Sequence, residues 1–206
     1  ERIPEMMRRA LRTSFRGRPG VVHLDVPENI MNGTFKPDAL DLRPPSAYRL
    51  TRPRPPDPAD VARSAGLLVG ARHPILHIGN GVLAARAWDE VVAVAELLRA
   101  PVTTSWAGRS AMVETHELSV PMIHVEVNNT VRNDADMVLA VGTRLGETDW
   151  WGKPPYWGPA GAQKLIQVDI DEDVLGVNKA LTLGVLADAR AYLEALKTEL
   201  EARPST

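Results

Sequence analysis

The sequence predicts an α/β fold, a doubly wound, Rossmann-like parallel sheet of about six strands with helices on both faces. Short apolar runs alternate with stretches of helical period after residue 59, which is typical of such sheets. The run 75–78 passes directly into Gly79-Asn80-Gly81 and a helical pattern, a strand, turn and helix unit. The 206 residues are 44% hydrophobic and 24% charged, which suits one domain with a sizeable core and additional segments.

The first 43 residues predict one helix and one strand. Pro4 suits a first helical turn, and Met7, Ala10 and Leu11 follow at helical spacing. Residues 21–26 alternate in polarity like a half-buried strand. The chain begins within the helical pattern, so we expect it to be a fragment of a longer protein. Arginines at 8, 9, 12 and 16 could bind phosphate, but a solvated or domain-facing helix surface is favoured.

Residues 44–58 form a proline-rich segment, which we interpret as an extended and fairly stiff linker. It separates residues 1–43 from a second domain at 59–206.

The second domain is expected to begin with a helix capped by Asp57 or Asp60 and to end with one capped by Asp188. Between them, Trp88, Val92, Ala95 and Leu98 predict the apolar stripe of a crossover helix. Five short apolar runs are predicted strands: 75–78, 102–104, 137–141, 164–168 and 183–186.

Composition excludes several classes of function. A net charge of −2 gives no basic field for nucleic acid or an anionic membrane surface, and the absence of cysteine excludes disulfides and thiolate metal sites. No apolar run is long enough to span a bilayer, and we expect a cytoplasmic protein. The sequence contains neither a G-x-x-x-x-G-K-[ST] phosphate loop nor a G-x-S-x-G nucleophile elbow. His73 and His77 have metal-like spacing but would lie across a strand, so we predict no metal ligand.

Ligands of parallel sheets bind where the strands end, so the residues after each strand are the candidate site. Gly79, Asn80 and Gly81 follow the first strand and could approach an anion through unpaired backbone N–H groups, or could serve only helix and strand packing. Thr104 and Ser105 end the second strand, where their hydroxyls could bind phosphate or ribose, or cap the next turn.

The later strands supply the rest of the candidate site. Gly142, Thr143 and Arg144 follow the third strand, and Arg144 could bind phosphate, stack on a flat ring, or pair with Glu147 or Asp149. After the fourth strand, Asp169 could accept hydrogen bonds from ribose or adenine, and Ile170 offers backbone groups. Asp188 after the last strand has the same chemistry, with helix capping as its alternative.

A loop at residues 147–161 is unusually aromatic. It contains Trp150, Trp151, Tyr156 and Trp157 among glycines and prolines. Because so much aromatic surface is costly to leave in water, we expect it to pack on another domain or subunit or to cover a ligand. Packing on its own domain is the alternative.

Five segments, in this order, resemble thiamine-diphosphate-dependent enzymes of the acetolactate synthase type. They are residues 17–27 (GRPGVVHLDVP), 73–81 (HPILHIGNG), 100–104 (APVTT), 135–145 (ADMVLAVGTRL) and 165–171 (LIQVDID). By this resemblance, residues 1–43 are the C-terminal end of a pyrimidine-binding domain. Residues 59–206 are a central, nucleotide-binding-like domain. Relatives hold FAD, ADP or nothing in that domain, and the residues lining its groove correspond to the candidate site named above.

The resemblance also implies what the chain lacks. The glutamate that activates thiamine diphosphate would precede Glu1, and the Gly-Asp-Gly…Asn motif that holds magnesium and the diphosphate would follow Thr206. We therefore assign no catalytic residue and expect the chain alone to be inactive. His116 is followed by no glycine, which departs from the pattern around the flavin in relatives.

Two classes of function follow from the sequence. The first is part of a thiamine-diphosphate-dependent carboligase or decarboxylase of 2-keto acids. Its partners would be the missing catalytic domains, in a homodimer or homotetramer. The second is a non-catalytic module that binds FAD or ADP or acts as a structural scaffold. An NAD-dependent dehydrogenase is disfavoured, because no Asp or Glu for the ribose follows the second strand.

Overall fold

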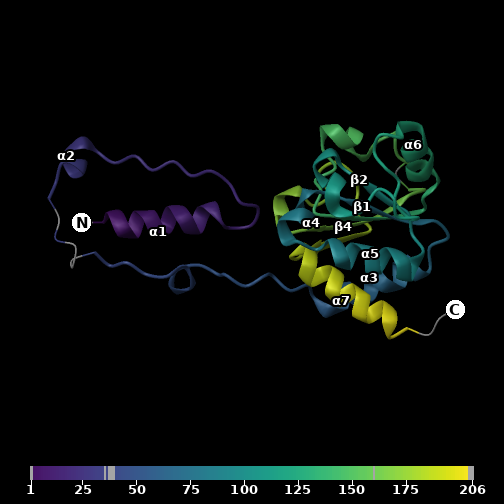
Figure 1. Ribbon diagram of the computed structural model, residues 1–206, viewed down its shortest axis with the longest axis horizontal. Helices are drawn as coiled ribbons and strands as arrows, with labels where there is room; N and C mark the ends of the chain where they lie inside the picture. The colour runs from purple at the N-terminus through teal and green to yellow at the C-terminus, as the bar shows by residue number, and fades with distance from the viewer. Residues whose placement is uncertain (1, 35, 37–39, 160, 204–206) are drawn as a thin grey trace. The chain divides into compact units, whose positions relative to one another are not determined.

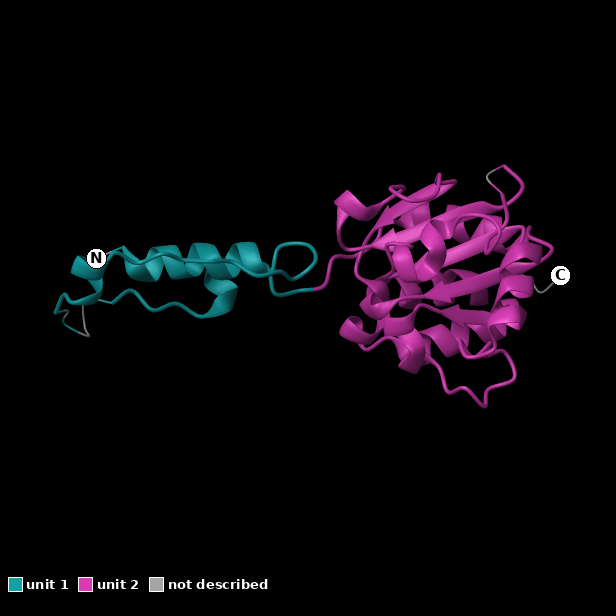
Figure 2. Ribbon diagram, turned by 90° about the horizontal axis from the view of Figure 1, so that it is seen from above, with its two compact units in different colours: residues 1–52 teal, residues 53–206 magenta. Residues whose placement is uncertain are grey.

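A computed structural model describes residues 2–34, 36, 40–159 and 161–203 of the chain. The chain divides into two compact units, residues 1–52 and 53–206, coloured separately in Figure 2. The division falls inside the predicted linker.

Unit 1 contains α1 (Ile3–Ser14), α2 (Glu28–Met31) and the short 3₁₀ helix η2 (Pro45–Ala47). Pro4 lies in the first turn of α1, as predicted. Arg8 forms an ion pair with Asp41 at 3.2 Å, and Arg12 donates to the carbonyl oxygen of Tyr48 at 2.6 Å. These arginines therefore bond within their own unit. None of the described side chains of unit 1 is fully buried.

The strand predicted at residues 21–26 is wrong. These residues belong to no β-ladder in the described part of the chain. An alternating pattern becomes a strand only when a neighbouring backbone supplies hydrogen bonds and a core covers the apolar side chains. No described strand pairs with this segment, and of its apolar residues Val22 is 37% exposed while Leu24 and Val26 are only partly buried, so neither condition is met.

Unit 2 is built on a five-stranded sheet in which all neighbouring strands are parallel. Its order is β2-β1-β3-β4-β5. The strands are β1 (Pro74–Ile78), β2 (Val102–Thr104), β3 (Met137–Val141), β4 (Lys164–Asp169) and β5 (Leu183–Leu186). The predicted fold is confirmed, with five strands instead of about six, each at a predicted position.

Helices cover both faces of this sheet. The α-helices are α3 (Pro58–Val69), α4 (Asn80–Ala85), α5 (Trp88–Leu98), α6 (Val125–Asp134) and α7 (Ala189–Glu201). Three 3₁₀ segments follow strands: η3 (Trp106–Ala111), η4 (Glu147–Gly152) and η5 (Glu172–Val174). In Figure 1, α3, α5 and α7 lie together on one face of the sheet, and α6 lies on the other. This arrangement is the doubly wound one.

The strands bury both faces because their residues are apolar on both sides. Leu76, Ile78 and Leu139 belong to the core beneath α3, α5 and α7. Ile75 and Val138 point to the opposite face and pack in a second, smaller core that includes Trp157.

The predicted helix caps are largely confirmed. The Asp57 carboxylate accepts from the N–H of Ala59, and Asp188 accepts from those of Arg190 and Ala191. The predicted stripe of α5 is partly wrong, because Val91, Val94 and Ala95 are its buried residues, whereas Trp88 is 42% exposed. Among the described residues, no helix is long and apolar enough to cross a membrane.

Candidate functional site at the carboxyl edge of the sheet

The strand register brings the predicted site residues to one edge of the sheet. Ile78 is paired with both Thr104 and Val141, and Val141 is paired with Val168. Asp169 is paired with Leu186. The residues that follow these positions therefore gather at the carboxyl edge, as the sequence predicts.

Three glycines at this edge form a direct backbone contact, which we call the glycine clasp: Gly79, Gly81 and Gly142. The N–H of Gly79 donates to the carbonyl oxygen of Val141 at 2.9 Å, and that of Gly81 donates to Gly142 at 3.0 Å. A Cβ atom on Gly79 would lie 2.2 Å from the Gly142 oxygen, and one on Gly81 would lie 2.6 Å from the Gly142 Cα. Of the two interpretations left open for this turn, the packing one describes the N–H groups of Gly79 and Gly81, which are paired within the chain.

The clasp explains why glycine is required at these positions. Gly142 has a φ of 63°, in the left-handed region, and a Cβ there would also overlap Gly81. The loops after β1 and β3 can therefore approach only as glycine backbones.

Several of the predicted polar groups are engaged within the chain. Ser105 accepts from the N–H of Gly108 and caps η3, and Thr143 donates to the carboxylate of Asp149 at 3.1 Å. Asp188 caps α7. The Asp169 carboxylate accepts from the N–H of Asp171 at 3.1 Å.

The remaining predicted residues differ in accessibility. Thr104 is buried and its carbonyl oxygen accepts a long hydrogen bond, 3.4 Å, from Arg132. Asn80 and Arg144 are exposed, and Ile170 is 37% exposed. The alternative ion pair of Arg144 with Glu147 or Asp149 is not formed in the described structure, because Asp149 instead faces His77 and Thr143.

Sequence reasoning missed a row of buried polar residues just before the carboxyl edge. The register aligns Thr103, His77, Ala140, Gln167 and Gly184 across the sheet. The Nδ1 atom of His77 lies 2.9 Å from the Thr103 hydroxyl, and Gln167 donates to the carbonyl oxygen of Thr143. The available signal was a polar residue within three of the five apolar runs, Thr103, His77 and Gln167, but only the register shows that these residues lie in one row.

This row continues into a buried charged cluster of His77, Asp149 and Arg132. His77 Nε2 lies 3.4 Å from Asp149 Oδ1, and both side chains are shielded from solvent. Burial lowers the pKa of His77 more than Asp149 raises it, and the charge of Arg132 lowers it further. Burial also lowers the pKa of Arg132, to about 10, against the effect of Asp149. Asp149 and Arg132 thus interact through their opposite charges, and burial favours the neutral form of His77.

Burial acts in the opposite sense on Asp149. It would raise the pKa of this carboxyl, but His77, Thr143 and Arg132 together outweigh burial and leave the pKa below its ordinary value.

The aromatic loop packs mainly on its own domain. Trp157 is fully buried, contacts the His77 ring edge-on at 4.9 Å and donates its indole N–H to the carbonyl oxygen of Asp149. Trp150 stacks on Tyr156 with ring centroids 4.4 Å apart. Arg132 lies over the rings of both Trp150 and Trp157. Local packing therefore accounts for three of the four aromatic residues, whereas Trp151 remains 46% exposed.

Lys179 bridges two positions within this loop. Its ammonium group donates to the carbonyl oxygens of Gly152 at 3.0 Å and Gly158 at 2.8 Å. Burial lowers the pKa of this lysine.

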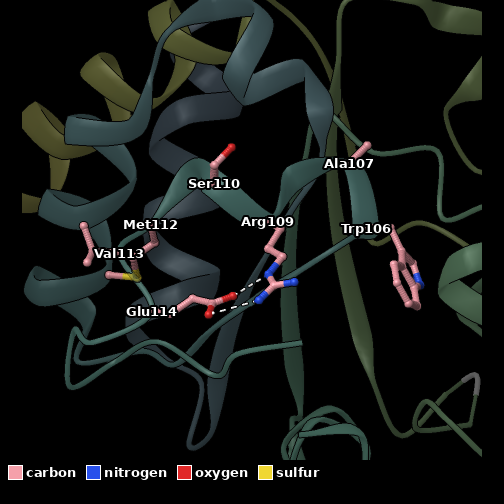
Figure 3. A pocket seen from close by; sticks show the side chains of 7 residues that line it. All are labelled: Trp106, Ala107, Arg109, Ser110, Met112, Val113 and Glu114. Carbon is pink, nitrogen blue, oxygen red and sulfur yellow. Dashed lines mark hydrogen bonds and ion pairs between the residues drawn. The ribbon is translucent and has the colours of Figure 1, made fainter. Parts of the chain in front are cut away.

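A surface hollow of about 570 Å³ lies beside η3, and none of the predicted site residues lines it. Figure 3 shows the ion pair of Arg109 with Glu114 and, beside it, the indole of Trp106. Trp106 is 66% exposed. In the described part of the chain, no group of three or more His, Asp or Glu side chains could hold a metal ion.

Unit 2 is a Rossmann-like α/β domain: its sheet is parallel, helices cover both faces, and the strands end at one edge. The chain belongs to the family described as thiamine pyrophosphate enzyme, central domain, whose model matches residues 61–196. The resemblance found in the sequence is thereby confirmed.

Curated relatives extend the similarity to nearly the whole chain. Sulfoacetaldehyde acetyltransferase of Rhodobacter capsulatus is 32% identical over 98% of this chain and 34% of its own length. Acetolactate synthase of Mycobacterium bovis is 30% identical over 94% of this chain and 31% of its own length. The chain thus spans about a third of these relatives.

A solved structure shares the fold. Benzoylformate decarboxylase from Polynucleobacter necessarius superposes with a TM-score of 0.76 at 19% identity, over 99% of this chain and 37% of that one.

Proposed function

We propose that this chain is the central domain of a thiamine-diphosphate-dependent transferase or lyase that acts on 2-keto acids. The family match over residues 61–196 supports this proposal. Two relatives that align along nearly the entire chain are named acetolactate synthase and sulfoacetaldehyde acetyltransferase. One name states the transfer of an acetyl group and the other the synthesis of acetolactate, so a carboligase is the favoured reaction class and a decarboxylase the alternative.

The cofactor and its magnesium ion would be bound outside this chain. When bound, thiamine diphosphate stabilises the carbanion that forms as a 2-keto acid is decarboxylated. The sequence contains no Gly-Asp-Gly motif, and no metal-binding group occurs among the described side chains. The chain would therefore contribute structure rather than chemistry, and by itself it would be inactive.

The form of unit 1 supports a role within a larger protein. Its described side chains are all at least partly exposed, including the apolar Met7, Leu11 and Phe15. A helix with an uncovered apolar face gains little stability by itself. We propose that residues 1–43 complete a pyrimidine-binding domain, and that the whole protein is a cytoplasmic homodimer or homotetramer.

The test compares the 206-residue chain with the protein made from its complete open reading frame. Each is incubated with thiamine diphosphate, magnesium and pyruvate, and release of carbon dioxide and formation of acetolactate are measured. We expect turnover only from the complete protein, and thiamine diphosphate binding by calorimetry only there. Binding or turnover by the 206-residue chain would contradict the proposal. So would a complete protein that binds no thiamine diphosphate.

A further inference from the structure

We propose that the carboxyl edge of this sheet is closed by the chain's own groups and binds neither FAD nor ADP. The inference rests on the proposed function and makes it more specific: the enzyme would depend on thiamine diphosphate without a second, adenine-containing cofactor in its central domain.

The N–H groups of Gly79 and Gly81 are already hydrogen-bonded within the chain. A dinucleotide in such a sheet places its diphosphate on N–H groups of the turn after the first strand. Here the N–H groups of Gly79 and Gly81 donate to Val141 and Gly142, and that of Val82 donates to Gly79 at 3.2 Å. A diphosphate would have to displace the bonds that join the exits of β1 and β3.

The space beside the glycines at this edge is occupied by other parts of the chain. In a dinucleotide site, glycine leaves room for the ligand to approach the backbone. In this chain the room beside the glycines is filled by backbone of neighbouring loops. A Cβ atom added to Gly79 would overlap Gly142 and Thr143, and one added to Gly108 would lie 2.3 Å from the carbonyl oxygen of Ile78. The loops after β1, β2 and β3 are thus in mutual contact.

Three of the side chains that could recognise ribose or phosphate bond within the chain instead. The hydroxyls of Ser105 and Thr143 are buried and hydrogen-bonded, and the carboxylate of Asp188 caps α7. Each is therefore already used by the fold. Asp169 and Asp188 also bring negative charge to this edge, which disfavours a diphosphate.

Two polar side chains stay exposed at the edge, Asn80 and Arg144. One guanidinium and one amide can attract an anion loosely, but they do not replace the backbone cradle that fixes a dinucleotide. They provide a way to test where any bound nucleotide lies.

The test uses the complete protein purified under native conditions. The protein is denatured, and released FAD and ADP are quantified by absorbance and mass spectrometry. The native protein is also titrated with FAD and with ADP while its melting temperature is followed. We expect much less than one nucleotide per chain and no shift in melting temperature. Near-stoichiometric FAD or ADP that is lost in the Arg144→Ala/Asn80→Ala variant would overturn the inference. Nucleotide retained in that variant would be located in a crystal structure of the complex. Nucleotide beside Gly79, Gly81 and Gly142 would overturn the inference, and nucleotide bound outside the central domain would leave it standing.

Failure of this inference can be separated from failure of the proposed function. If the complete protein turns over with thiamine diphosphate and also binds a nucleotide at the carboxyl edge, only the inference that this edge binds neither FAD nor ADP is refuted. A nucleotide-free protein without thiamine-dependent turnover would refute only the proposed function.

Discussion

The imidazole of His77 and the carboxylate of Asp149 face each other 3.4 Å apart beneath the carboxyl edge of the sheet, and neither is accessible to solvent. His77 comes from β1, an inner strand of the sheet, whereas Asp149 comes from η4 in the aromatic loop. The pair therefore links the sheet to the loop that covers it. The charge of Arg132 also lowers the pKa of Asp149, as expected when a buried carboxylate has an opposite charge nearby.

Asp149→Ala is expected to lower the free energy of unfolding by about 3 kcal/mol, because it leaves Arg132 charged and buried without its carboxylate. It also removes the acceptor of the Thr143 hydroxyl. Urea unfolding followed by tryptophan fluorescence measures the change. Glu147→Ala is the matched control, since Glu147 is an exposed acid in the same loop, and its effect should stay within about 0.5 kcal/mol. Equal effects of the two substitutions would contradict the role of Asp149.

Stability should fall as the pH drops below about 6.5, the ordinary pKa of histidine. Because burial lowers the pKa of His77, the unfolded chain binds a proton there before the folded chain does. The loss per pH unit approaches about 1.4 kcal/mol between the unfolded and folded pKa values and is absent above them. Asp149 adds a separate loss at lower pH, because its folded pKa lies below its ordinary value and its stabilisation disappears as that pKa is crossed.

The pH effect is measured as the free energy of unfolding between pH 4.5 and 8, a range of roughly two units on either side of the histidine pKa. His77→Gln should flatten the slope near pH 6, whereas His73→Gln, at an exposed position, should leave it unchanged. A slope that is the same in all three proteins would show that His77 does not titrate differently in the folded state.

The sheet was predictable because its signals are local. Each strand is a short apolar run, and Asp57 and Asp188 stand where helix caps are expected. The failure of residues 21–26 to form a strand could not be predicted in the same way. Their pattern is local, but a ladder requires a neighbour, and the described chain supplies none.

The site was only partly predictable. Gly79, Gly142 and Asp169 were correctly predicted to lie on one edge, because each stands at the end of a predicted strand. Whether a glycine approaches a ligand or another glycine depends on which loops become neighbours, which the pattern G-x-G does not contain. The contact between His77 and Asp149 could not be predicted either, because these residues are 72 positions apart in the sequence and become neighbours only in the fold.

Lys179→Met should lower the free energy of unfolding by about 2 kcal/mol, because it leaves the buried carbonyl oxygens of Gly152 and Gly158 without a donor. Hydrogen exchange should accelerate most between residues 152 and 158. Lys153→Met is the control, because Lys153 is exposed in the same loop. Unchanged exchange in Lys179→Met would mean that the loop is held mainly by Arg132 and its aromatic contacts.

Gly142→Ala should be among the most damaging single substitutions in unit 2, with a loss of more than about 3 kcal/mol. A methyl group there faces two penalties: the left-handed φ of 63° and a distance of 2.6 Å to the Cα of Gly81. Gly66→Ala is the control. Gly66 lies in α3, where an added Cβ would meet only the end of Arg203 at 3.6 Å, so alanine should stabilise the helix by about 0.5–1 kcal/mol. Thermal unfolding of the soluble proteins measures both changes. Because the carboxyl edge depends on this contact, an alanine at 142 that left the melting temperature unchanged would show that the loops after β1 and β3 can separate freely.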